Sequence, residues 1–253
     1  MSTSTTGGKN IHPSLYYLKD KISKNDLVLD LGCKNGKYMD KLSTKTVSVD
    51  ISFTETSGET EYVYGDGFNL PFNSNSFDFV FCSQTLEHVP DTGTIVAEAS
   101  RVLKRNGKCI FTFPNRLAPT KPHPLPRWYS YLPVPIGTRI APYLLDDETV
   151  EFYRTSEFMM TTITAQKHLN RIFSDVEYLT FQTSDYDPSP HTLTKLAKRV
   201  DENIPIVRSL LRLFWPDVQY LCKDPNIAEE SRPDARNNLL VKKQKDLRDN
   251  APG

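Results

Sequence analysis

This chain of 253 residues lacks long apolar runs and any excess of charge of one sign. No stretch of about 18 apolar residues occurs, and residues 1–10 contain no apolar run of the signal-peptide kind. We therefore expect a cytoplasmic protein without a transmembrane segment. Lysine plus arginine and aspartate plus glutamate number 31 each, so no overall field attracts nucleic acid or an anionic membrane, although a local patch remains open.

Paired cysteines are also missing. The four cysteines lie far apart in the sequence, form no Cys-x-x-Cys pair, and three of them lie beside or within apolar runs. This pattern favours reduced, buried thiols over a disulfide framework or a zinc site. The residues are Cys33, Cys82, Cys109 and Cys222.

The composition is that of a globular protein with one main core. Hydrophobic residues make up 38% of the chain and charged residues 25%, which allows a sizeable interior and a polar surface. We predict a flexible N-terminus over residues 1–10, a single domain over 11–223, and a polar C-terminal tail over 224–253.

Short apolar, β-branched segments alternate with segments of helical periodicity along the domain. Such alternation predicts an α/β fold with a mostly parallel, doubly wound sheet and right-handed crossovers. The predicted strands are residues 26–31, 46–50, 61–64, 77–82, 108–113, 176–181 and 218–222, and the predicted helices are 15–22, 38–42, 92–103, 157–173 and 192–214.

The composition changes after the fifth predicted strand. Eight prolines fall between Pro114 and Pro142, interleaved with tryptophan and tyrosine, which predicts neither a helix nor a central strand up to about residue 145. We treat residues 114–153 as an insertion, because irregular segments of that length are usually functional or disordered. Its aromatic and basic residues either line an acceptor site or form a core of their own.

Four polar or glycine-containing segments follow directly after predicted strands: residues 30–36, Asp50, 65–67 and 83–84. In an open α/β sheet such segments meet at the carboxyl edge, where ligands bind. A glycine turn lets backbone amides approach a ligand, and a carboxylate after the second strand can accept hydrogen bonds from a ribose diol. Taken singly, the loop could be a tight turn and Asp50 a solvated strand end.

These segments resemble the motifs of class I methyltransferases in order. Residues 28–36 resemble the motif usually written D-L-G-C-G-x-G, Val49-Asp50 the acidic ribose motif, and 65–72 the adenine-side motif. Residues 76–89 resemble the fourth-strand segment and 98–114 the segment leading into the fifth strand. The resemblance covers about residues 25–115 and is greatest to the small-molecule group that includes quinone-biosynthesis (methyltransferase type 11) enzymes.

The resemblance implies a Rossmann-like, seven-stranded sheet whose last strand is antiparallel, with the insertion after strand five. It also implies that S-adenosyl-L-methionine (SAM) is the cofactor, with its methionine part, ribose and adenine contacted in turn by these loops. The implied cofactor-binding residues are Asp30, Gly32, Cys33, Gly36, Asp50, Ile51, Asp66, Gly67, Ser83 and Gln84.

Lys34 departs from the family motif, which has a glycine there. If the position requires a positive φ, a lysine costs about 1–2 kcal/mol, which would weaken cofactor binding or indicate a lapsed enzyme. We expect instead that Lys34 projects outward and that Asn35 takes the left-handed conformation, which asparagine tolerates.

Methyl transfer to a hydroxyl or an acidic carbon needs a base of near-neutral pKa, and histidine is the natural candidate. His88 and His123 are the two candidates, and a structural or solvated role is the alternative for each. No metal is predicted, because the segment from Gln84 to His88 lacks the first carboxylate of the Glu-x-x-Glu-His pattern found in metal-using relatives.

The expected function is methyl transfer from SAM to O, N or C of a small-molecule, lipid-linked or glycan-like acceptor. A nucleic-acid methyltransferase is disfavoured because no Asn-Pro-Pro-Tyr-type motif follows the fourth strand. A nucleotide-dependent oxidoreductase is disfavoured because the G-x-G-x-x-G spacing is absent. The alternative left open is a non-catalytic module that binds SAM or a partner, which Lys34 suggests.

Overall fold

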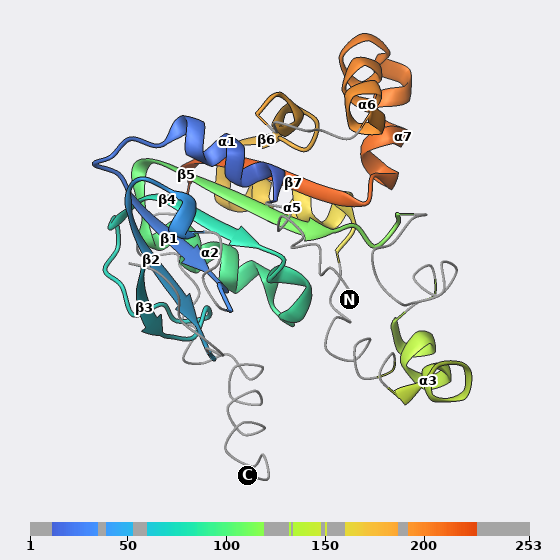
Figure 1. Cartoon of the computed structure of the whole chain (residues 1–253). Coiled ribbons are helices and arrows are strands. Elements are labelled where there is room, and N and C mark those ends of the chain that lie inside the picture. The colour runs from blue at the N-terminus through green and yellow to red at the C-terminus, as the bar shows by residue number, and fades with distance from the viewer. Residues whose placement is uncertain are drawn as a thin grey trace, which may run out of the picture.

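The computed structural model describes residues 12–34, 39–52, 60–118, 132, 134–147, 150, 160–186 and 192–226. Within these residues, seven strands form one sheet in the order β3-β2-β1-β4-β5-β7-β6 (Figure 1). The strands from β3 to β5 pair in parallel, and β7 runs antiparallel to both β5 and β6. The predicted fold class is confirmed. The strands are β1 Leu27–Leu31, β2 Lys45–Asp50, β3 Glu61–Tyr64, β4 Phe77–Ser83, β5 Leu103–Pro114, β6 Phe173–Tyr178 and β7 Asp217–Pro225.

The helices follow the sequence pattern in most places. The α-helices are α1 Pro13–Lys21, α2 Thr92–Val102, α3 Val134–Leu144, α5 Thr162–Ile172, α6 Thr192–Asn203 and α7 Pro205–Phe214. Three 3-10 turns, η1 Met39–Lys41, η2 Leu86–His88 and η4 Gln182–Asp185, complete the described elements.

Alternate residues of the central strands separate two hydrophobic layers. Leu29 of β1 packs with the apolar faces of α2 and α5, while its neighbour Val28 packs with Leu15 and Leu18 of α1 on the other side of the sheet. Strands β1 and β4 are buried along almost their whole length because helices cover both faces. The carboxyl edge of the sheet is thereby left for the loops that carry the candidate site.

Two helix predictions were wrong. The helix predicted over 192–214 is divided at Ile204, because Pro205 lacks the N–H that would continue the ladder and fits the first turn of a new helix. The insertion is not free of helix either, since α3 lies inside it with Pro142 near its C-terminal end. Pro142 has no N–H to donate to the carbonyl four residues earlier, so α3 forms with one ladder hydrogen bond missing near its C-terminal end.

Other boundaries moved by smaller amounts. The predicted strand over 176–181 begins earlier, at Phe173, directly after α5 ends at Ile172. Where a helix was predicted over residues 38–42, the described residues form only the 3-10 turn η1. Strand β7 continues to Pro225, beyond the predicted domain end at 223. Residues 1–10 and most of the tail lie outside the described residues. All four cysteines are free thiols, as predicted, and all but Cys33 are fully buried.

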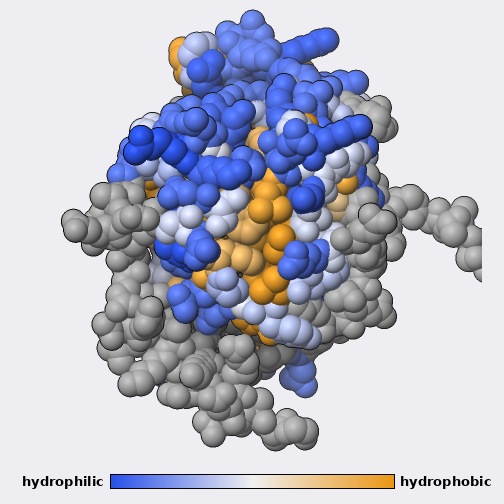
Figure 2. Space-filling view, turned by 90° about the vertical axis from the view of Figure 1, so that its left-hand side faces the viewer, coloured by the Kyte–Doolittle hydropathy of each residue, from blue (hydrophilic) through white to orange (hydrophobic). Residues whose placement is uncertain are grey.

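The surface is largely hydrophilic. On the face drawn in Figure 2, a narrow apolar strip runs between hydrophilic side chains. Among the described helices, none is long and apolar enough to cross a membrane.

Candidate cofactor site

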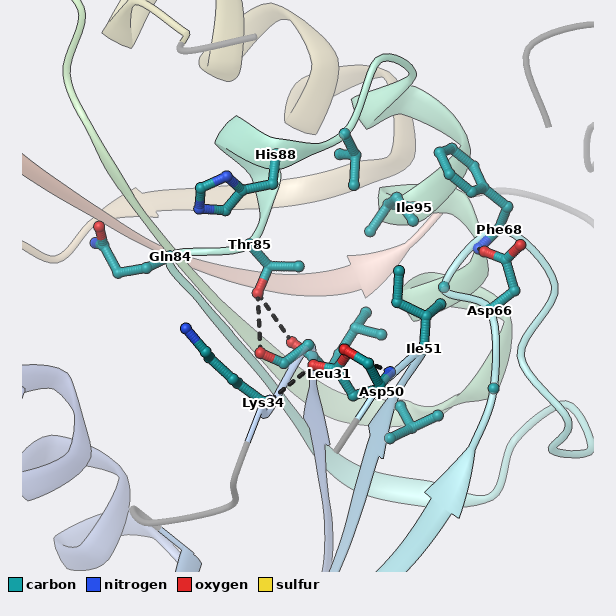
Figure 3. Close-up of a pocket in the computed structure, with 16 residues that line it drawn as sticks. Leu31, Lys34, Asp50, Ile51, Asp66, Phe68, Gln84, Thr85, His88 and Ile95 are labelled. Carbon is teal, nitrogen blue, oxygen red and sulfur yellow. Dashed lines mark hydrogen bonds between the residues drawn. The ribbon is translucent and has the colours of Figure 1, made fainter. Parts of the chain in front are cut away.

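A cavity of about 550 Å³ opens at the carboxyl ends of β1, β2, β3 and β4 (Figure 3). The four segments that the sequence placed after strands therefore converge, as the crossover topology requires. Its lining residues are Leu31, Gly32, Lys34, Val49, Asp50, Ile51, Ser52, Gly65, Asp66, Gly67, Phe68, Gln84, Thr85, His88, Val89 and Ile95.

The turn after β1 is closed tightly onto the loop after β4. Gly32 has φ +76°, and its N–H donates to the carbonyl of Val49 at 2.9 Å. The hydroxyl of Thr85 lies 3.3 Å from the carbonyl oxygen of Leu31 and 3.4 Å from that of Gly32. A Cβ added at Gly32 would lie 2.3 Å from Thr85 Oγ1, so this position has room only for glycine.

Lys34 takes the left-handed conformation itself, with φ +53°. The expectation that Lys34 would leave this conformation to Asn35 was therefore wrong, because the backbone turns at Lys34 to aim its N–H at Asp50 Oδ2, 2.7 Å away. The side chain is exposed and extends from the β1 loop on the side of Gln84 (Figure 3). Asn35, like Gly36, lies outside the described residues.

Asp50 ends β2 with its carboxylate at the cavity. The N–H of Lys34 donates to Oδ2, and the N–H of Ser52 donates to Oδ1 at 3.0 Å. A carboxylate has about four lone-pair positions, so both oxygens retain capacity for a ligand's hydroxyl groups. The orientation of Asp50 is thus fixed by backbone donors before any ligand arrives.

The part of the cavity wall formed by the segments after β2 and β3 is mainly apolar. Asp66 follows β3 and accepts a hydrogen bond from the N–H of Phe68 at 3.0 Å, which fixes the turn that contains Gly67. Beside this turn, the exposed side chain of Ile51 and the buried side chain of Ile95 face the cavity (Figure 3). A flat, partly apolar ring fits between such walls, with polar atoms reaching Asp66.

The loop after β4 is fixed by partners that are far away in the sequence. Gln84 has φ +54°, and its side-chain amide donates to Asp217 Oδ1 of β7 at 3.3 Å. The other oxygen of Asp217 lies 3.1 Å from His12 Nε2. Ser83 faces away from the cavity lining, with its hydroxyl 2.8 Å from that of Thr112. Gln84 and Thr85 are the residues that this loop presents to the cavity.

Two buried carboxyl groups lie beneath the site. Asp30 is 3% exposed, and burial, assisted by the charge of Asp50, raises its pKa to about 7. Burial likewise raises the pKa of Glu87 to about 7. Each has one carboxyl oxygen that finds no hydrogen-bond partner within the described structure. Cys33 is half-buried beside Asp30, and burial raises the pKa of its thiol to about 12, so the thiol is neutral and not a nucleophile.

His88 is the one histidine among the lining residues of the described cavity. Its side chain is 47% exposed, and its Nε2 lies 3.9 Å from Glu87 Oε1. His123 lies outside the described residues. Among the described residues, no group of three or more histidine, cysteine or acidic side chains could hold a metal ion.

Residues 29–111 match the family model described as a methyltransferase domain. Over this third of the chain, the sequence is that of a methyltransferase domain. The matched residues contain β2, β3 and β4, most of β1 and β5, and every residue that lines the cavity. The resemblance read from the motifs is confirmed.

Curated relatives agree with the family match. The chain is 28% identical over 99 residues to 27-O-demethylrifamycin SV methyltransferase of Amycolatopsis mediterranei, which covers 33% of this chain and 36% of that protein. It is 26% identical over 175 residues to a demethylmenaquinone methyltransferase of Lactobacillus johnsonii, covering 62% and 71%. The chain spans less than half the length of several of the curated relatives it matches.

Solved structures share the fold of the methyltransferase domain. One is phosphoethanolamine N-methyltransferase 2 of Haemonchus contortus in complex with SAM, with a TM-score of 0.51 and 13% identity over 84% of this chain and 52% of that one. At this identity the likeness concerns the fold alone.

The conformation of Lys34 leads to a stability prediction. Because asparagine tolerates a positive φ better than lysine, Lys34→Asn is expected to raise the free energy of unfolding by about 0.5–1 kcal/mol. Urea denaturation of both proteins measures the change. Lys24→Asn, at an exposed position without positive φ, is the control and should change stability little. A destabilised Lys34→Asn would mean that the lysine side chain contributes more than its backbone strain removes.

Proposed function

We propose that this protein transfers the methyl group of SAM to O, N or C of a small-molecule, lipid-linked or glycan-like acceptor. The observation that carries the proposal is the pairing of the Gly32 turn with the Asp50 carboxylate across one cavity. The turn gives backbone an approach to the methionine part, and Asp50 is oriented to accept hydrogen bonds from both ribose hydroxyls. The family match and the relatives support the same cofactor.

The residues present fit the cofactor. A volume of about 550 Å³ lies within the range of cavities that bind molecules of this size. The apolar side chains of Ile51, Phe68 and Ile95 suit the adenine ring, and Gln84 and Thr85 lie where the methionine end would be held. Lys34 lines the cavity and contributes its backbone N–H to Asp50.

SAM supplies an activated methyl group on a sulfonium, which transfers by in-line displacement. The contribution of the protein is therefore mainly to align the acceptor and to exclude water. His88, exposed at the cavity, is positioned to remove a proton from an acceptor hydroxyl or acidic carbon. The carboxyl of Glu87 lies next to it, with Oε1 3.9 Å from Nε2. A quinone-type small molecule is the first class to test, because one of the relatives is named for demethylmenaquinone.

Calorimetric titration with SAM and with S-adenosylhomocysteine tests the cofactor site. We expect binding by the wild type and a loss of about tenfold to hundredfold in affinity in Asp50→Ala, since hydrogen bonds to a charged group contribute about 1.5–3 kcal/mol. Asp26→Ala, a half-buried carboxylate just before β1 that does not line the cavity, is the control and should bind like the wild type. A folded, cofactor-free wild type that binds neither ligand would refute the proposal.

A further inference from the structure

Helix α7 has its polar side turned toward the protein. Arg212 donates two hydrogen bonds of 2.6 Å to the carboxylate of Asp201, a buried residue of α6. Its guanidinium also lies 4.7 Å from the centre of the Tyr178 ring. Arg208 donates to the backbone carbonyl of Asp201 at 2.7 Å. The charged residues of α7, together with the half-buried Leu211 that packs against the main hydrophobic cluster, therefore anchor it to the body of the molecule.

The apolar side of α7 consequently faces outward. Ile206 is 89% exposed and Leu210 58% exposed, and no residue of α7 is buried. In a surface helix of a globular protein the apolar side normally packs on the core, so this arrangement leaves a surface that another apolar phase would stabilise. We call it the α6–α7 apolar surface, and its exposed members are Leu193, Leu196, Ile204, Ile206, Val207, Leu210 and Phe214.

The charge that remains unpaired beside this surface is positive. The acids of α6 have basic partners, Asp201 in Arg212 and Glu202, more loosely at 3.7 Å, in Lys198, which also pairs with Asp185. Lys195 and Arg199 are exposed on α6 and form no ion pair with any residue that the structure describes. Apolar side chains with flanking cations are complementary to an anionic lipid surface, where the cations meet headgroups and the apolar side chains enter the acyl boundary.

The α6–α7 apolar surface lies next to the carboxyl edge that carries the candidate site. The side-chain amide of Asn115, directly after β5, donates to the carbonyls of Leu213 and Trp215 at 2.7 and 2.9 Å. The chain then enters β7 at Asp217, whose carboxylate accepts the hydrogen bond from Gln84 at the cavity. Figure 1 shows α6 and α7 stacked at the end of β7 where this strand begins.

We propose that the α6–α7 apolar surface docks this protein onto the surface of an anionic lipid bilayer. A symmetric contact with a second copy is less favourable, because Lys195 and Arg199 of both copies would share one interface. Docking at this edge would bring the cavity close to the lipid surface. The docking itself does not depend on methyl transfer, so the two proposals can fail separately.

Vesicle sedimentation of the full chain, without cofactor, tests the docking. Wild type should bind phosphatidylcholine vesicles that contain phosphatidylglycerol at least about tenfold more strongly than pure phosphatidylcholine vesicles, and added salt should weaken the binding. Ile206→Glu/Leu210→Glu should lose this binding by at least about tenfold. Both positions are exposed, so the fold should tolerate the change, which circular dichroism would verify.

A control variant matches the change in charge. Arg105→Glu alters the net charge by the same amount as the double variant, at an exposed position near the opposite edge of the sheet, and should bind vesicles like the wild type. Equal loss in Arg105→Glu and the double variant would overturn the proposal, since overall charge alone would then explain binding. Absence of vesicle binding by the wild type would also overturn it, as would a dimer in sedimentation velocity that the double variant converts to a monomer without any vesicle binding.

Discussion

Asp30→Asn is expected to become progressively more stable than the wild type as the pH rises from about 5 to about 8, gaining about 2–3 kcal/mol over that range. Asp30 is buried at the end of β1, and one of its carboxyl oxygens has no hydrogen-bond partner within the described structure. Burial and the nearby charge of Asp50 raise its pKa from 3.8 to about 7. An asparagine of the same shape carries no ionisable group.

The direction follows from proton binding. Since the folded pKa of Asp30 is raised, the folded protein holds a proton between pH 3.8 and about 7 that the unfolded chain releases. Wild-type stability therefore falls as pH rises through this window and reaches a constant penalty of about 4 kcal/mol above it. Glu87, whose pKa burial also raises to about 7, adds a fall in the same direction.

Urea denaturation at several pH values measures this effect. A buried asparagine amide without a partner would shift the stability of Asp30→Asn by the same amount at every pH, so the pH dependence isolates the carboxyl. Asp26→Asn gives the baseline, because this carboxylate just before the same strand is only half-buried and accepts a hydrogen bond from the N–H of Ser23. A difference between wild type and Asp30→Asn that stays constant with pH would show that Asp30 ionises as easily in the folded protein as in the unfolded chain.

Much of the sheet could be predicted from the sequence because its strands are local patterns. The runs that became β1 and β4 are apolar on both faces, which only strands covered by helices on both sides tolerate. Asp50 and the Gly32 turn end such runs, so the parallel topology alone brings them to one edge. The ligand-side residues of β1, β2 and β3 were predictable for this reason.

The remaining features depend on contacts between distant parts of the chain. Nothing local predicts that Asp217 of β7 holds Gln84 and contacts His12, because the three meet only when the last strand inserts beside β5. Thr85 was missed as a site residue for the same reason: its role is to face Gly32 across the sheet edge. The break before Pro205 could have been read from the sequence, but the outward apolar side of α7 could not, since it requires the Arg212 and Asp201 pair.

Gly32→Ala is expected to lower the free energy of unfolding by about 2–4 kcal/mol and to abolish SAM binding. Two effects add at this position. A φ of +76° disfavours any residue with a Cβ, and that Cβ would lie 2.3 Å from Oγ1 and 2.4 Å from Cγ2 of Thr85. To relieve this clash, the turn after β1 and the loop after β4 must move apart. That movement carries the backbone of the β1 turn, which lines the cavity, away from Asp50.

Gly93→Ala is the matched control, because the same Cβ added there meets nothing closer than 3.4 Å. Gly93 lies in the first turn of α2, so alanine should stabilise the helix by up to about 1 kcal/mol and leave SAM binding unchanged. Adding Thr85→Ala to Gly32→Ala removes the two closest atoms and should restore part of the stability, leaving the cost of the backbone conformation and of the Cβ of residue 85, which lies 2.9 Å away. Wild-type stability and affinity in Gly32→Ala would show that the turn adjusts freely, and the close contact with Thr85 would then not define the cofactor site.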